Sequence, residues 1–244
     1  TDEMIQMART LREENPSIWG LAYEFDSLYF HAPWLHGFGG RIYRGRGDEL
    51  ALDDAAATRS VEFVRRLVSK EQIMPEEISS ALITSLFRQH KLAFVLSGPW
   101  FKGELAGHDE WGVAPLPVVS ETGQYAQPFL GVEGVFLNAY SQNKRAAFGL
   151  MKHLTSDSEA LSRLREGSQL VANQRPYDDS SVLKDPFIAA FRSQVVRTQP
   201  LSNRPHMKTV WTPMKRALNQ SIARGRSAQE ALREAVDTIR RAGE

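Results

Sequence analysis

Short apolar runs alternate with amphipathic helical patterns through this chain, and the final third is almost purely helical in pattern. "IWGLAYEF" (18–25) and "LAFVL" (92–96) predict strands, whereas "DDAAATRSVEFVRRLVSK" (53–70) predicts a helix capped by Asp53. A later run, "GVEGVFLNA" (131–139), is again typical of a strand. This alternation predicts an α/β fold with a helical C-terminal portion.

Composition excludes several classes of protein. The 244 residues include 30 Lys and Arg against 29 Asp and Glu, so no charge excess indicates a nucleic-acid partner. Cysteine is absent, which excludes a disulfide framework and a thiol nucleophile. The six histidines are scattered, and the G-x-S-x-G, H-E-x-x-H and P-loop patterns are missing. We therefore expect no metal site, no cofactor and no enzymatic activity.

Aromatic residues gather at three places where a strand or connector gives way to a loop or a helix. Tyr29 and Phe30 fall in "DSLYFHAPWLHGFGG" (26–40), which we expect to have loop and turn character. Trp100 ends "VLSGPW", and Trp211 follows a proline-rich connector. Ligands of α/β sheets bind beyond the carboxyl ends of the strands. Flat rings there suit the C–H faces of a sugar, although each ring could instead pack in the core.

Three long stretches carry a family resemblance through their order and spacing. They are "EISSALITSLFRQHKLAFVLSGPWFKGEL" (77–105), "WGVAPLPVVSETGQYAQPFLGVEGVFLNAYSQNKRAAFGLMKHLTSDSEAL" (111–161) and "HMKTVWTPMKRALNQSIARGRSAQEALREA" (206–235). The chain resembles the maltose-binding-protein type of extracellular solute-binding proteins, which feed ABC sugar importers. The resemblance implies a two-lobe binding protein that closes around its ligand by a hinge motion.

The resemblance also implies that most of the first lobe is missing, since the family has roughly a hundred residues before this point, as usual lobe sizes suggest. We expect a periplasmic-binding-protein type II-like second lobe with a helical C-terminal portion, plus a partial first-lobe segment. Residues 1–125 and 175–244 would form the second lobe, and residues 126–174 would return to the first. Without its sheet partners, we expect the segment 129–173 to be repacked, swapped with another copy of the chain, or paired with a missing segment.

The implied sugar site consists of stacking rings and a nearby acidic position of the family. These positions fall on Tyr29, Phe30, Trp100 and Trp211 for the rings, and near Asp26 and Ser27 for the acidic residue. Lys102 stands where the maltose binders carry a further Trp, so the length or type of ligand is left open.

The implied function is that of the carbohydrate-binding component of an ABC importer, in the periplasm or another extracytoplasmic space. Its partners would be a maltose-like oligosaccharide and the transmembrane subunits of the permease. The alternative is a permease-attached or sensory interaction domain of the same fold that binds no sugar independently. Rings that line an open surface would favour sugar binding, and rings buried between helices would favour the interaction domain.

Overall fold

The computed structural model describes residues 1–45, 47–108 and 110–243. They form two compact units, each assembled from separate segments of the chain. Unit 1 consists of Thr1–Ser97, Leu116–Phe129 and Arg197–Glu244, and unit 2 consists of Gly98–Pro115 and Leu130–Val196. The division of the chain into lobes at residues 125 and 174 stays a prediction.

Unit 1 begins with a helix that packs on a pair of parallel strands. The apolar runs at residues 18–25 and 92–96 predict the two strands. Strand β1 (Trp19–Ala22) pairs with β2 (Leu92–Val95), and Leu21 lies beside Phe94. Helix α1 (Asp2–Glu14) crosses β1 closely at Gly20, where an added Cβ would lie 2.4 Å from the Cβ of Ala8. Glycine is therefore required at position 20 by the approach of α1.

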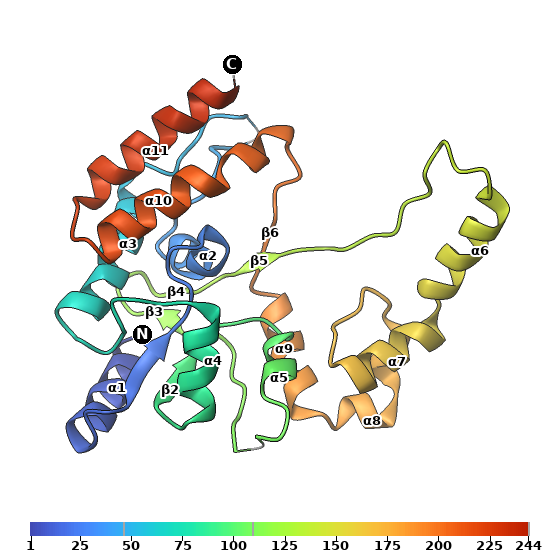
Figure 1. The fold of residues 1–244 in the computed structure, drawn as a ribbon, viewed down its shortest axis with the longest axis horizontal. Coiled ribbons are helices and arrows are strands. Elements are labelled where there is room, and N and C mark those ends of the chain that lie inside the picture. Colours follow the sequence, from blue (N-terminus) through green and yellow to red (C-terminus); the bar gives the residue numbers. More distant parts are fainter. Residues whose placement is uncertain (46, 109, 244) are drawn as a thin grey trace. The chain divides into compact units, whose positions relative to one another are not determined.

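One hydrophobic core joins the remaining helices of unit 1 (Figure 1). Helices α3, α10 and α11 pack against one another, with α2 against α3 and α10. The bounds are α2 Leu28–Gly37, α3 Ala55–Ser69, α4 Ser80–Arg88, η2 Pro205–Thr209, α10 Trp211–Ile222 and α11 Ala228–Gly243. Two further strand pairs are β3 (Val118–Val119) with β4 (Gln124–Tyr125), and β5 (Phe129–Leu130) with β6 (Gln199–Pro200).

Helix α2 corrects the prediction of a loop over residues 26–40. The backbone N–H of His31 donates to the carbonyl of Ser27, and the helix runs on through Pro33 to Gly37. Its residues are buried on nearly every side, so the sequence has no amphipathic period that would indicate a helix. Burial inside unit 1, rather than patterning, stabilises this helix.

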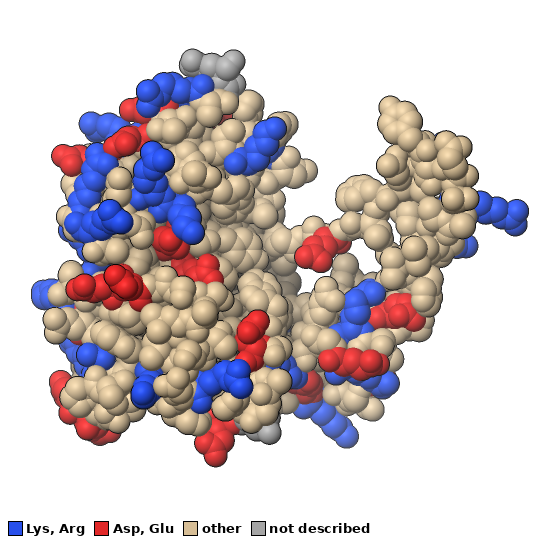
Figure 2. Space-filling model, in the orientation of Figure 1, with Lys and Arg blue, Asp and Glu red and all other residues tan. Residues whose placement is uncertain are grey.

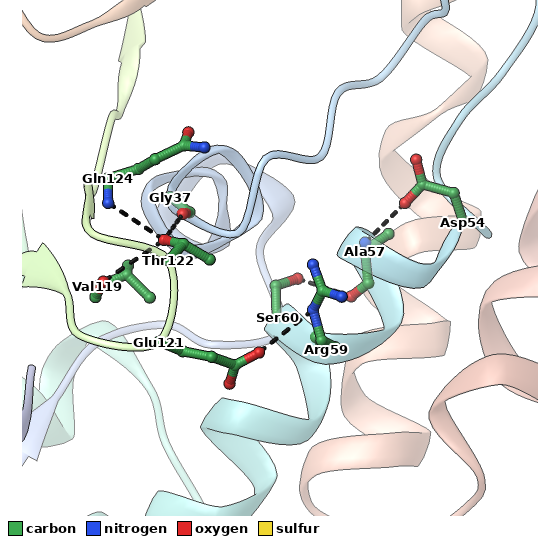
Figure 3. A network of polar contacts seen from close by, with 9 residues as sticks. All are labelled: Gly37, Asp54, Ala57, Arg59, Ser60, Val119, Glu121, Thr122 and Gln124. Carbon is green, nitrogen blue, oxygen red and sulfur yellow. Dashed lines mark hydrogen bonds and ion pairs between the residues drawn. The ribbon is translucent and has the colours of Figure 1, made fainter.

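The turn between β3 and β4 is fastened to both α2 and α3 (Figure 3). Thr122 Oγ1 donates to the carbonyl oxygen of Gly37 at 2.7 Å, at the end of α2. Arg59 Nε of α3 lies 3.4 Å from Glu121 Oε1 on the same turn. These contacts fix the end of α2 and the chain that leads to β5.

The cap of α3 is Asp54 rather than the predicted Asp53. The Asp54 carboxylate accepts from the backbone N–H of Ala57 at 2.8 Å (Figure 3).

We expect Asp54→Ala to lower the free energy of unfolding by about 1 kcal/mol, because an N–H of the first turn then loses its acceptor. Denaturant unfolding checks this, and Asp53→Ala is the matched control with little expected effect. Equal losses in the two variants would contradict the assignment of the cap.

Unit 2 is mostly helical and has a small core of its own. Its elements are α5 (Phe101–Glu104), α6 (Lys144–Leu154), α7 (Asp157–Gly167), η1 (Arg175–Asp178), α8 (Ser180–Leu183) and α9 (Pro186–Val195). Leu164, Val182, Phe187 and Ile188 form the buried cluster. Trp111 packs edge-on against Phe187 at 6.0 Å between centroids, which ties residues 98–115 to α9.

The predicted strand at residues 131–139 is wrong. Between β5 and α6 the chain runs extended with every residue from 131 to 139 exposed, and no described residue pairs with it as a strand (Figure 1). Val132 is 80% exposed and Phe136 is 91% exposed. A strand is defined by its ladder of hydrogen bonds, so an apolar run without a neighbour does not form one.

No helix in the described part of the chain combines the length and the apolar character that crossing a bilayer requires.

Candidate functional site

Asp26 and Ser27 lie in the short link between β1 and α2. Lys215 Nζ of α10 lies 3.6 Å from Asp26 Oδ2, so a carboxylate and an ammonium group stand together at this position. The Asp26 side chain is about one-fifth exposed. Ser27 occupies the position before α2, and its hydroxyl does not cap that helix.

Four aromatic rings, three of them close to Asp26 or Lys215 in the sequence, form a continuous row. Tyr29 meets Phe30 edge-on, with 5.5 Å between ring centroids. Tyr29 also lies 6.1 Å from Phe129, and Phe129 lies 6.4 Å from Trp211 in an edge contact. The row thus joins the start of α2, strand β5 and the first residue of α10. These centroid distances fall in the range that favours aromatic pairs.

The row has a buried centre and partly exposed flanks. Phe129 is only 7% exposed, whereas Tyr29, Phe30 and Trp211 are partly exposed while packing on the core. Burial raises the pKa of the Tyr29 phenol. A phenol is protonated at neutral pH in any case, so the hydroxyl is a hydrogen-bond donor. Ring faces, a phenol, a carboxylate and an ammonium group together suit a polyhydroxylated ligand.

Trp100 belongs to unit 2, where its indole lies over Gly98. A Cβ added at Gly98 would lie 2.2 Å from ring atoms of Trp100. The glycine of "VLSGPW" therefore leaves room for the indole, which is 55% exposed. Lys102 Nζ lies 4.8 Å from the ring centroid of Phe187 in the same unit. The assignment of Trp100 to a sugar site stays a prediction.

Phe129 is the ring of the row that was not predicted from the sequence, whereas Lys215, close to Trp211 in the chain, was considered as a residue that could orient a ligand, with a solvated helix face as the favoured interpretation. Phe129 is the central ring of the row, and Lys215 pairs with Asp26. Lys215 follows Trp211 by four residues on α10, a spacing that places both side chains on one side of a helix. That spacing is a sequence signal for Lys215, whereas nothing near Phe129 indicates contact with residues 29 and 211.

Charge on the surface is mixed rather than segregated. Figure 2 shows lysines and arginines interspersed with acidic residues over the face that is visible. No group of three or more His, Asp or Glu among the described residues could hold a metal ion.

A comparison with models of protein families shows to which family the chain belongs. The model of the family described as bacterial extracellular solute-binding protein matches residues 1–160. The chain belongs to this family. The resemblance inferred from the sequence is thereby confirmed.

Curated relatives carry names that refer to oligosaccharides. The galactooligosaccharide-binding protein of Bacillus subtilis is 25% identical over 92% of this chain and 55% of its own length. A maltooligosaccharide ABC transporter solute-binding lipoprotein of Streptococcus pneumoniae is 22% identical over 89% of this chain and 52% of its own. The chain therefore spans about half the length of these relatives.

A solved structure confirms the predicted fold class. The Thermus thermophilus maltotriose-binding protein, in complex with maltotriose, matches 100% of this family member with a TM-score of 0.88 and 26% identity. The match covers 66% of that solved chain, so about one-third of it has no counterpart in these 244 residues.

Proposed function

We propose that this family member forms part of the carbohydrate-binding component of an ABC sugar importer and recognises a maltose-like oligosaccharide by ring stacking. The row formed by Tyr29, Phe30, Phe129 and Trp211 carries the proposal. A pyranose ring presents flat C–H faces to aromatic rings and hydroxyl groups at its edge. The Asp26–Lys215 pair, whose members stand three residues before Tyr29 and four after Trp211 in the sequence, offers both an acceptor and a donor for those hydroxyls.

The residues proposed to bind sugar are the six that the resemblance implied. Tyr29, Phe30 and Trp211 would stack, Asp26 and Ser27 would bind hydroxyls, and Trp100 stays a predicted stacking residue. The partial exposure of the first three rings supports this role, since fully buried rings would be unavailable to a ligand.

Binding alone would account for the activity, with no bond made or broken in the sugar. The family is one of solute-binding proteins, and its description as extracellular supports an extracytoplasmic location. The pneumococcal relative is named as part of an ABC transporter, which supports permease subunits as partners.

The exposed segment of unit 2 supports a second partner, which is a complementary polypeptide. Val132, Phe136 and Tyr140 are each at least 80% exposed, and α6 adds Phe148 and Leu150, each more than half exposed. Large apolar side chains exposed in such number along one part of the chain are typical of an interaction site. The Thermus structure matches this segment along with the rest of the chain and has about one-third more polypeptide, which could cover such a surface.

We expect the 244-residue chain alone to bind maltotriose with a dissociation constant of about 1 mM or weaker, because most of the lobe that completes the site in the family is expected to lie outside these residues. Supplying the remaining first-lobe polypeptide by coexpression should tighten binding by at least tenfold. Titration followed by the indole N–H resonance of Trp211 checks both results.

Tyr29→Ala should abolish the response of the Trp211 resonance, and Trp19→Phe, on β1, is the matched control that should preserve it. Micromolar binding by the chain alone would contradict the incomplete site. If coexpression yields a stable complex that gives no sugar response, the interaction domain without independent sugar binding becomes the better assignment. The exposed apolar surface of unit 2 is the observation that favours this second function.

A further inference from the structure

His36 on α2 holds the backbone of the segment that carries the central ring of the row. Its Nδ1 atom lies 2.7 Å from the carbonyl oxygen of Gln127, and the residue is 2% exposed. A carbonyl oxygen only accepts, so the Nδ1 atom of the neutral imidazole must carry the proton. The contact fixes both the tautomer of His36 and the position of the chain two residues before Phe129.

The imidazole of His36 also touches the ring of Phe129 itself. The two rings meet edge-on, with 5.1 Å between centroids and 78° between planes. Phe129 in turn contacts Tyr29 and Trp211. One side chain therefore contacts both the backbone that leads to Phe129 and its ring.

Tyr29 of α2 contacts the ring of Phe129, and His36 supplies a side-chain hydrogen bond from α2 to the backbone of the segment 127–129. The backbone N–H of Gln127 donates to the carbonyl oxygen of Pro33 at 3.2 Å, and that of Gln199 donates to the carbonyl oxygen of Pro128 at 2.9 Å. These are backbone bonds, which a change of side chain at position 36 leaves in place. The side-chain contact is the part of the arrangement that can be altered separately.

His31 is a natural comparison on the same helix. It is 1% exposed, and its Nε2 atom lies 3.1 Å from Ser60 Oγ. Ser60 Oγ donates to the carbonyl oxygen of Ala57 at 2.7 Å, so it accepts from His31. His31 is thus bound to α3 rather than to the segment 127–129. Both histidines are buried, but only His36 is bonded to the segment that carries the ring row.

We infer that His36 is a positioning residue for ligand binding, which sets the place of Phe129 between Tyr29 and Trp211. The role in ligand binding rests on the proposed function, whereas the effect on the rings does not. Loss of both contacts lets the segment 127–129 shift, and the ring of Trp211 then loses its edge partner in the observed orientation.

Three substitutions separate the two contacts. His36→Asn keeps an N–H donor near the Nδ1 position and loses the ring, His36→Phe keeps a ring and loses the donor, and His36→Leu loses both. His31→Asn is the control for burial of a histidine on α2. The indole resonance of Trp211, assigned from its absence in Trp211→Phe, reports ring position, and denaturant unfolding reports stability.

We expect His36→Leu to shift the Trp211 resonance and to raise the dissociation constant for maltotriose about tenfold in the complemented protein, with His36→Asn recovering part of both effects. His31→Asn should lower stability without moving that resonance. A His36→Leu shift no larger than that of His31→Asn would overturn the inference. If His36→Leu does not fold, the same comparison is made with His36→Asn and His36→Phe, and the absence of a shift in both overturns it.

The experiment tests the proposed function and the placement of the rings separately. A sugar response that is equal in all His36 variants refutes the positioning role while the proposed function stands. A Trp211 resonance that depends on His36, in a complemented protein that does not respond to sugar, supports the placement of the rings and refutes the proposed function.

Discussion

Acidification from about pH 7 to about pH 4.5 is expected to remove roughly 2 to 3 kcal/mol of unfolding free energy for each of two buried histidines. Burial, aided by the charge of His36, lowers the pKa of His31 from 6.5 to about 3. Burial also lowers the pKa of His36 to about 4, although its bond to Gln127 opposes the shift and Arg41 adds to it. The combined loss is a large part of the stability of an ordinary domain.

The sign follows from proton uptake on unfolding. Below pH 6.5 the unfolded chain binds protons at both imidazoles, whereas the folded chain does not until the pH approaches 4 for His36 and 3 for His31. Stability is therefore complete above pH 6.5 and falls as the pH drops below it. For His31, no described residue accepts from its Nδ1 atom, so the added proton would have no partner.

Denaturant unfolding at several pH values measures this slope. Replacing His31 by Phe should remove its share of the slope between pH 6.5 and about 4. A flat stability profile across that interval would contradict the neutral, buried state of the two imidazoles.

Replacing Trp34 by Ala is the second large effect. We expect it to lower the free energy of unfolding by about 3 to 5 kcal/mol, as is typical when a buried aromatic side chain is truncated. Trp34 is 1% exposed, and its ring lies 5.2 Å from Phe63 and 6.5 Å from Tyr23 between centroids. Truncation leaves a cavity between α2 and α3, where rigid neighbours on both elements cannot fully collapse.

Trp100→Ala is the matched control in unit 2, with an expected loss below about 1 kcal/mol because the indole is more than half exposed. Denaturant unfolding of each variant gives the comparison. A similar loss at both positions would show that Trp34 is not the core residue that its contacts indicate.

Sequence patterning predicts elements that have one buried face and fails for those that do not. Helix α3 has one buried face and one exposed face, so the sequence predicted the helix. Only its cap was misplaced, by one residue. Helix α2 is surrounded by core on nearly every side, so its sequence lacks the period that identifies a helix. The prediction of a strand at 131–139 was wrong for a different reason. The segment has a strand-like pattern, but no described residue pairs with it.

The ring row was predicted at three of its four members. Tyr29 and Phe30 are adjacent in sequence and Trp211 stands at a helix start, so local features indicated them. Phe129 contacts them across about a hundred residues on one side and about eighty on the other, and such contacts depend on how distant segments pack. His36 was not among the predicted site residues, because the sequence does not show the carbonyl of Gln127 beside it.

The assembly of unit 1 from three segments has a consequence for its synthesis on the ribosome. Val64 and Leu67 of α3 share one core with Leu218 of α10 and Leu232 of α11. The nascent chain therefore exposes the apolar face of α3 until the last segment emerges, and the core closes only after translation of that segment.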